Sequence, residues 1–276
     1  MLKIPIYTLT YYDIISIIMQ SKTYLQQCME RNGRLSRWPQ SLMPLCVYIA
    51  PFRWYKSMGE ADSYKYKQMV INAFQTWQTQ LSGMVVFNIV QNLHDSHINV
   101  EWKRVERKSL GNCQFNYDKL GRYYSAEVNI GLSDGIIHRK YMDENEVYHT
   151  ILHEVGHAIG LGHSPNIEDI MYTPHQYGRI NLSRNDIQTA RFLYKFDVGK
   201  TEQEILNQHS QYNAKNIDHL VSILLGEKTG FQKEMDKINS SPSKDLIEEN
   251  ANIGELKKYL MQIHNIKFNF NNDKKN

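Results

Sequence analysis

The stretch His153–His163 reads HEVGHAIGLGH, and Met171 follows eight residues after its last histidine. On a helix, His153 and His157 lie one above the other on a single face, so their imidazole nitrogens can converge on one metal ion. His163 follows six residues later and reaches the same ion if the chain turns back sharply. Three neutral histidines with one position left for water are the coordination typical of a catalytic zinc site.

Glu154 and two glycines also fit a catalytic zinc site. Glu154 lies one residue from the first ligand and can reach over a water molecule that the metal holds. Gly160 can leave the helix through a conformation that other residues avoid, and together with Gly162 it allows the sharp return to His163. The alternative is three histidines with no metal, which requires the whole HExxHxxGxxH pattern and the later methionine to be coincidental.

The long pattern followed by a methionine resembles the metzincin metallopeptidases. Within them the chain is similar to the matrixins, because Ser164-Pro165 follows the third histidine and Ile170-Met171-Tyr172 matches that family's turn. The resemblance covers about residues 37–196 and suggests a minimal, bacterial-type catalytic domain. It implies an α+β fold with a twisted mixed sheet, two long helices, a Met-turn and a closing C-terminal helix.

The residues and the resemblance together predict a zinc metalloendopeptidase that hydrolyses peptide bonds in protein or peptide substrates. His153, His157 and His163 would hold one Zn²⁺, which lowers the pKa of its water and polarises the scissile carbonyl. Glu154 would take the water proton as general base and pass it to the leaving nitrogen. Met171 would form a hydrophobic floor under the metal without bonding to it.

Four residues are predicted to line the pocket for the substrate residue after the cut, namely His149, Tyr172, Pro174 and Tyr177. His149 continues the ligand row, but each helix turn rises about 5.4 Å, so it lies too far from His157 to share one ion comfortably. By resemblance it forms pocket wall at the base of the site instead. An ordinary aromatic loop remains the alternative for the other three.

Composition bounds the remaining possibilities. The 276 residues, 41% hydrophobic and 22% charged, describe a globular protein with one domain and an extension, or two small domains. A net charge of +3 is too small to indicate nucleic-acid or membrane binding, and no apolar run reaches the length of a membrane span. The three cysteines are too few for a disulfide framework and suit a reducing compartment, although one bridge is possible.

Residues 1–36 are predicted to form a helical lead-in with an apolar stripe that includes Ile14 and Ile18. Two interpretations are open: a helix packed on the main domain, or a pro-segment that covers the active site. By resemblance Cys28 could then occupy the open zinc position, yet it lacks the family's Pro-Arg-Cys-Gly surroundings. No clear secretory signal precedes it, which favours a cytoplasmic location, with secretion by another route as the alternative.

Periodicity predicts the elements of the domain at 37–196. A long helix is expected over 60–81, with Trp77 pointing to the core. Strands are expected at 44–50, 85–90, 98–102 and 126–131. Residues 111–124 carry turn residues and are expected to be looser. By resemblance, the strand at 126–131 should offer its edge to an extended substrate.

The active-site helix is expected to begin at Asp143, because Glu146 three residues later completes a capping arrangement. Its apolar stripe lies about 160° from its histidine stripe, so one face meets the core and the other the cleft. That apolar stripe consists of Val147, Ile151, Val155 and Ala158.

A second capping signal, Ser183 with Asp186, predicts the closing helix through Phe196. By resemblance, Asp186 hydrogen-bonds beneath the Met-turn. Asn185 stands where the family has an acidic residue that receives the freed N-terminus. Activation by removal of a pro-segment is therefore less well supported.

Extra structural zinc or calcium ions are not supported, because His94, Asp95 and His97 come before the 98–102 strand and not after it. A polar turn is expected there. Residues 197–276 lie outside the resemblance and are predicted to be a polar helical extension with a disordered end. Two rival functions remain: a catalytically silent zinc-binding scaffold that binds a partner through this extension, and a regulatory peptidase with one dedicated substrate. The sequence does not indicate an oligomeric state.

Overall fold

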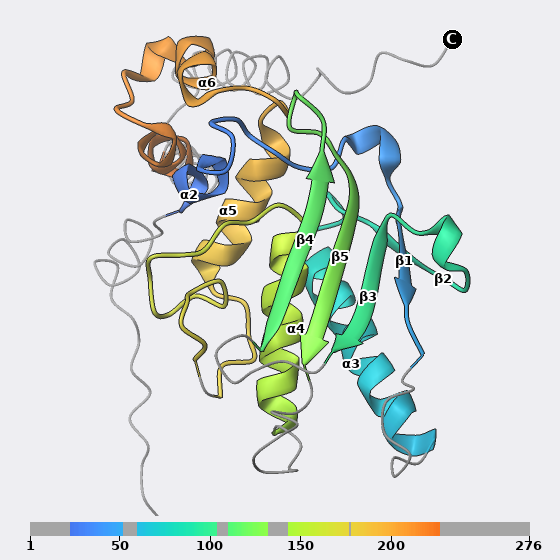
Figure 1. Ribbon diagram of the computed structural model, residues 1–276. Coiled ribbons are helices and arrows are strands. Elements are labelled where there is room, and N and C mark those ends of the chain that lie inside the picture. Colours follow the sequence, from blue (N-terminus) through green and yellow to red (C-terminus); the bar gives the residue numbers. More distant parts are fainter. Residues whose placement is uncertain (1–22, 52–59, 104–109, 132–142, 177, 227–276) are drawn as a thin grey trace, which may run out of the picture. The chain divides into compact units, whose positions relative to one another are not determined.

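The computed structural model describes residues 23–51, 60–103, 110–131, 143–176 and 178–226 (Figure 1). Within them, five strands form one sheet in the order β2-β1-β3-β5-β4. The strands are β1 Leu45–Ile49, β2 Phe87–Val90, β3 Ile98–Lys103, β4 Gly111–Tyr117 and β5 Tyr123–Gly131. Neighbouring strands are parallel except β4, which runs antiparallel to β5. The predicted α+β class with a mixed sheet is confirmed.

The two long helices lie on the same face of the sheet (Figure 1). They are α3 Glu60–Gln80 and α4 Glu144–Ala158. Trp77 of α3 is fully buried, as its helical position predicts, and its Nε1 donates to the carbonyl oxygen of Leu152 in α4 at 3.0 Å. This contact fixes the helix that carries the histidines against the one behind it.

Shorter helical elements flank this core. They are α2 Leu25–Met29, α5 Arg184–Lys195, α6 Glu202–Gln208, a further helix over 217–226, and the 3₁₀ turns η1 Gln40–Leu42, η2 Leu93–Asp95 and η3 Ser210–Tyr212. In α5, Ser183 and Asp186 form the expected reciprocal capping box. His97, which follows η2, accepts a hydrogen bond on Nδ1 from the backbone nitrogen of Cys46 at 2.9 Å. No helix in the described part of the chain is long and apolar enough to cross a membrane.

Two expectations about the sheet are wrong. Residues 111–117 are not a loose piece but the strand β4, in which half-buried Cys113, Phe115 and Tyr117 alternate with exposed polar residues. The alternation was present in the sequence, but glycine and amide side chains masked it. Because β4 pairs along β5, the strand at 126–131 has neighbours on both sides and cannot offer its edge. The edge on that side of the sheet belongs to β4.

The described part of the N-terminal segment, from residue 23 onward, packs in the core. Its helix α2 has only five residues, and the apolar stripe at 14–18 lies outside the described residues. Tyr24, Leu25 and Leu35 are at most 1% exposed. Beyond α5, Ile205 and the inward residues of the 217–226 helix are buried in the same core. The proposed boundaries near residues 36 and 196 remain predictions.

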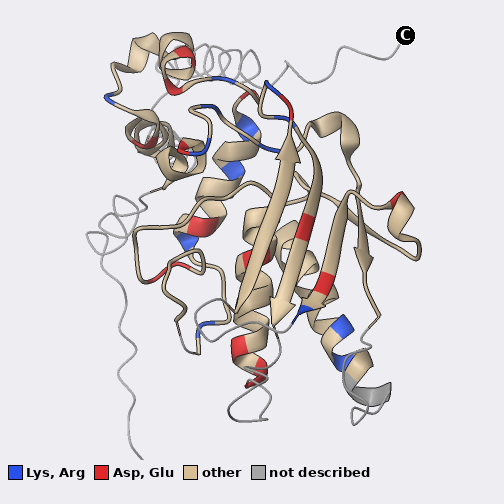
Figure 2. Ribbon diagram, in the orientation of Figure 1, with Lys and Arg blue, Asp and Glu red and all other residues tan. Residues whose placement is uncertain are grey.

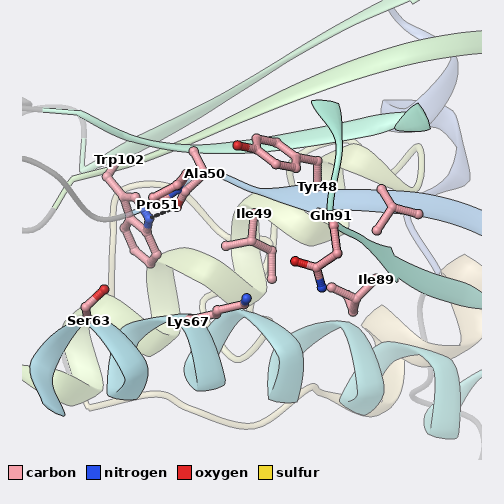
Figure 3. A pocket seen from close by; sticks show the side chains of 10 residues that line it. Tyr48, Ile49, Ala50, Pro51, Ser63, Lys67, Ile89, Gln91 and Trp102 are labelled. Carbon is pink, nitrogen blue, oxygen red and sulfur yellow. Dashed lines mark hydrogen bonds between the residues drawn. The ribbon is translucent and has the colours of Figure 1, made fainter. Parts of the chain in front are cut away.

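A cavity of about 230 Å³ lies where the carboxyl ends of β1, β2 and β3 meet α3. Figure 3 shows the side chains of Lys67 and Gln91 extending toward each other across it, beside Trp102. The indole Nε1 of Trp102 donates to Ala50 O at 3.0 Å. None of the residues that line this cavity belongs to α4 or to the segment 159–172, so it is separate from the histidine site.

Candidate active site

Helix α4 begins and packs as its sequence predicts. Asp143 Oδ1 accepts a hydrogen bond from the backbone nitrogen of Asn145 at 2.9 Å, which satisfies a free amide of the first turn. At the other end, Trp38 Nε1 donates to Ala158 O at 2.7 Å. The inward stripe is fully buried: Val147, Ile151, Val155 and Ala158. The opposite face is therefore left for the histidines.

The two glycines after the helix serve different purposes. Gly160 has φ +111°, a conformation that favours glycine. Gly162 has no positive φ, and it is needed for a close approach instead. A Cβ there would lie 2.5 Å from Gln27 O. The loop that leads to His163 is thus pressed against the N-terminal segment, which sequence reasoning did not foresee.

The three predicted ligands converge. The potential ligand atoms of His153, His157 and His163 all lie within 4.8 Å of one another, and the Nε2 atoms of His157 and His163 are 3.2 Å apart. His153 Nδ1 lies 2.8 Å from Ile170 O, and His157 Nδ1 lies 2.9 Å from Leu161 O. Because a carbonyl only accepts, each of these Nδ1 atoms carries the proton and leaves an Nε2 lone pair directed at the shared centre.

This donor set fits a zinc ion. Imidazole nitrogens are ordinary zinc ligands, and three of them leave a position open. Burial lowers the pKa of His153 to about 4, so this ring is neutral at pH 7 and its lone pair is free to coordinate. Burial likewise lowers the pKa of His157. Neutral rings held by backbone carbonyls are ready for a metal without having to lose a proton.

Glu154 lies beside the histidines on α4. It is only 5% exposed, and its Oε2 is buried with no hydrogen-bond partner among the described residues. Burial raises the pKa of this carboxyl to about 8, and a nearby cation would oppose that shift. A Cβ on Gly111 would lie 2.7 Å from Glu154 Cγ, so the start of β4 passes directly over the carboxylate. An orphaned carboxylate oxygen beside three imidazoles suits a site that binds water and metal.

Met171 is fully buried and packs against α4. A Cβ on Gly156 of α4 would lie 2.3 Å from its sulfur, so this glycine permits the contact. The Met-turn is held from below by Asp186, which accepts from the backbone nitrogens of Ile170 at 2.8 Å and Met171 at 3.4 Å. The expected role of Asp186 is therefore confirmed.

His149 is not part of the histidine triad. It is 1% exposed, its Nδ1 lies 2.7 Å from Arg179 O, and its ring centroid is 4.1 Å from that of His175. His175 was missed by sequence reasoning, since it lies in the loop after the Met-turn with no recognisable spacing. Its Nε2 is buried without a partner among the described residues. The His149 ring also lies beside His153, with ring centroids 6.3 Å apart.

The remaining pocket residues stay predictions. Tyr172 is half-buried and forms an isolated bridge with Ser164. Pro174 is exposed. Tyr177 lies outside the described residues.

Comparison with known proteins gives the family. The model of the family described as Matrixin matches residues 51–195, more than half of the chain. The chain belongs to the matrixin family. This places the convergent histidines, Glu154 and Met171 in a family of zinc-dependent metallopeptidases.

The relatives of this chain include viral and plant proteins. The chain is 38% identical over 130 residues to a probable matrix metalloproteinase of Invertebrate iridescent virus 3, covering 43% of this chain and 35% of the relative. It is 31% identical over 86 residues to metalloendoproteinase 1 of Glycine max, covering 30% and 25%. It is 26% identical over 133 residues to a putative matrix metalloproteinase of Trichoplusia ni ascovirus 2c, covering 41% and 26%. The chain thus spans about a quarter to a third of the length of these relatives.

Two hydrogen bonds join the start of the closing helix α5 to other parts of the chain. Asn185 donates from Nδ2 to Asp169 Oδ1 at 3.1 Å. The Tyr24 hydroxyl donates to Asp186 Oδ1 at 2.7 Å. The N-terminal segment therefore contacts this end of the helix directly.

Cys28 of this matrixin contacts the loop that leads to His163. Its Sγ accepts from Gly162 N at 3.2 Å and donates to Tyr24 O at 3.5 Å. It is not among the residues whose ligand atoms gather at the histidines. Burial raises the pKa of the thiol to about 12. In this arrangement Cys28 holds the loop that carries His163.

The Cys28 thiol should resist alkylation in the folded matrixin. With a pKa of about 12, only about one thiol in ten thousand is ionised at pH 8. Iodoacetamide should leave Cys28 unmodified in native protein and modify it fully in guanidinium, as read by peptide mass spectrometry. Rapid native labelling of Cys28 would show instead that the thiol leaves the core and is free to act as a switch.

Proposed function

We propose that the protein is a zinc metalloendopeptidase that hydrolyses peptide bonds in protein substrates. The observation that carries the proposal is the convergence of three imidazole nitrogens within 4.8 Å beside a buried carboxylate oxygen that lacks a partner among the described residues. Membership of the matrixin family supports the same chemistry. A purely structural metal site has no use for a carboxylate in this position.

The residues divide the chemistry between them. His153, His157 and His163 would hold a zinc ion, which supplies Lewis acidity toward the scissile carbonyl and lowers the pKa of water. Glu154 takes the proton of the attacking water and delivers it to the leaving nitrogen. Met171 closes the floor of the site and keeps solvent from the underside of the histidines.

The substrate backbone would bind along β4. β4 is the edge strand of the sheet in the described part of the chain, and an extended peptide could add to the sheet at its outer side. Gly111 brings this edge close to Glu154, because a larger residue would collide with the carboxylate. The scissile bond would therefore pass between the start of β4 and the histidines.

Metal removal tests the proposal. The full chain should contain about one zinc per molecule, since the residues that the structure describes offer one three-histidine site. Ortho-phenanthroline should abolish cleavage of casein and of quenched fluorescent peptides, and added zinc should restore it. Meta-phenanthroline, which does not chelate, is the matched control.

The second candidate is the silent zinc-binding scaffold that binds a partner through residues 197–276. The intact Glu154 counts against it. Two results together would favour the scaffold over the peptidase. The zinc-loaded protein would cleave no protein or peptide in this assay, and the Glu154→Gln variant would still bind a partner.

A further inference from the structure

Arg31 places a positive charge beside the edge strand β4. Its Cζ lies 4.1 Å from the ring centroid of Phe115 in β4. Its Nη1 donates to the Tyr123 hydroxyl at 3.3 Å. Phe115 in turn stacks on Tyr123, with ring centroids 4.6 Å apart. The guanidinium of an otherwise exposed residue is thus positioned by two aromatic rings of the sheet.

The segment that carries Arg31 also contacts the loop that leads to the third histidine. This segment is anchored by Cys28, whose sulfur accepts from the backbone nitrogen of Gly162, next to His163. Arg31 therefore belongs to a segment that contacts both the edge strand and the loop that leads to His163.

The position of Arg31 along β4 tells which half of a substrate it would meet. Gly111 lies at Glu154, and Phe115 lies four residues further, about 13 Å along a strand. Glu154 delivers its proton to the leaving nitrogen, so the leaving half of the substrate lies on the Glu154 side. Phe115 and Arg31 then face the residues on the amino side of the cut, about two to four positions before it.

Nothing on β4 itself competes with this charge. Its residues 111–117 include no charged side chain, and Figure 2 shows the strand uncoloured over its length. Among the described residues Arg31 forms no ion pair with a carboxylate. A guanidinium has five N–H donors, and one hydrogen bond leaves most of them available.

We propose that Arg31 is a specificity-determining residue that selects substrates with an acidic side chain two to four residues before the scissile bond. The inference rests on the proposed peptidase function. A carboxylate at that position would meet a guanidinium already fixed by Phe115 and Tyr123, so little side-chain freedom is lost on binding. The alternative is a structural role, in which Arg31 only joins the N-terminal segment to the sheet.

Matched peptides distinguish these two roles. The assay measures how fast the full-length, zinc-loaded protein cleaves quenched fluorescent peptides. The peptides differ only in carrying Glu, Gln or Lys at each of the positions two to four residues before the scissile bond. At the best position kcat/KM should be about three- to five-fold higher for Glu than for Gln, the size of a partly exposed ion pair. The preference should shrink in 0.5 M salt, roughly where the screening length approaches 4 Å.

Substitutions then assign the preference to the guanidinium. Arg31→Gln should abolish the Glu preference, Arg31→Lys should retain part of it, and Arg31→Glu should favour the Lys peptide. Arg34→Gln is the matched control, because Arg34 lies in the same segment but contacts Gly199 O at 2.8 Å and Glu204 at 3.8 Å instead of β4. A merely structural residue would change activity on all three peptides equally.

Binding to the Glu154→Gln protein separates this inference from the proposed function. Fluorescence anisotropy of the same peptides on that zinc-loaded variant reports charge selection without hydrolysis. Cleavage with equal Glu to Gln ratios in the wild type and in folded Arg31→Gln overturns the role of Arg31 and leaves the peptidase intact. Charge-selective binding without cleavage by the wild type overturns the peptidase and supports the role of Arg31.

Discussion

Replacing Glu154 by glutamine should reduce kcat/KM for peptide hydrolysis by about a hundred- to ten-thousand-fold and leave the zinc content unchanged. Glutamine keeps the shape of the side chain but cannot accept a proton from water. The histidines are untouched, since the Nδ1 atoms of His153 and His157 are held by Ile170 O and Leu161 O and not by Glu154. Steady-state kinetics with zinc analysis on the same preparation measures both quantities.

Helix α4 contains a second glutamate that serves as a matched control for the Glu154→Gln substitution. Glu144 lies ten residues earlier on α4, exposed and paired with Lys65 at 2.7 Å. Glu144→Gln should behave like the wild type, because a surface ion pair contributes little. If Glu154→Gln kept more than a tenth of the wild-type rate, the proton would have to be taken by another group, and the role assigned to Glu154 would be wrong.

Deleting residues 1–36 should prevent the domain from folding. The deletion removes several buried side chains from the core, and burying a large apolar side chain contributes about 1.5–3 kcal/mol. Their sum is comparable with the whole free energy of unfolding of an ordinary domain, about 5–15 kcal/mol. The buried residues removed are Tyr24, Leu25, Cys28, Met29 and Leu35. Circular dichroism and thermal unfolding of the shortened chain measure the loss.

A chain that begins at residue 23 is the matched control for this deletion. It keeps every contact described for the N-terminal segment, including Tyr24 with Asp186 and Cys28 with Gly162. It should unfold cooperatively, with bound zinc. A chain starting at residue 37 that unfolds within a few degrees of this control would show that the segment is an accessory and not part of the core.

The metal site could be predicted because its signals are local. Histidines four residues apart on one helix face need no knowledge of the rest of the chain, and the buried stripe from Val147 to Ala158 follows from the same periodicity. The capping box of Ser183 with Asp186 is equally local. The sheet was predictable wherever its strands are apolar.

The missing parts depend on contacts between distant residues. Strand β4 is an edge strand with amide side chains, and only its pairing with β5 reveals it. The hydrogen bond from Tyr24 to Asp186 joins residues 162 positions apart, and no spacing pattern in the sequence predicts it. Arg31 beside Phe115 and His175 against His149 likewise arise only when loops meet in the folded chain.

One carboxylate, that of Asp186, receives the Tyr24 hydroxyl and the backbone nitrogens of Ile170 and Met171. The N-terminal segment and the floor of the metal site therefore share a single anchor. In a zymogen, cutting the chain ahead of the domain releases activity. Here a cut between residues 23 and 36 would free Tyr24 from Asp186 and loosen the Met-turn, so we expect proteolysis at that place to disrupt the metal site and not to expose it.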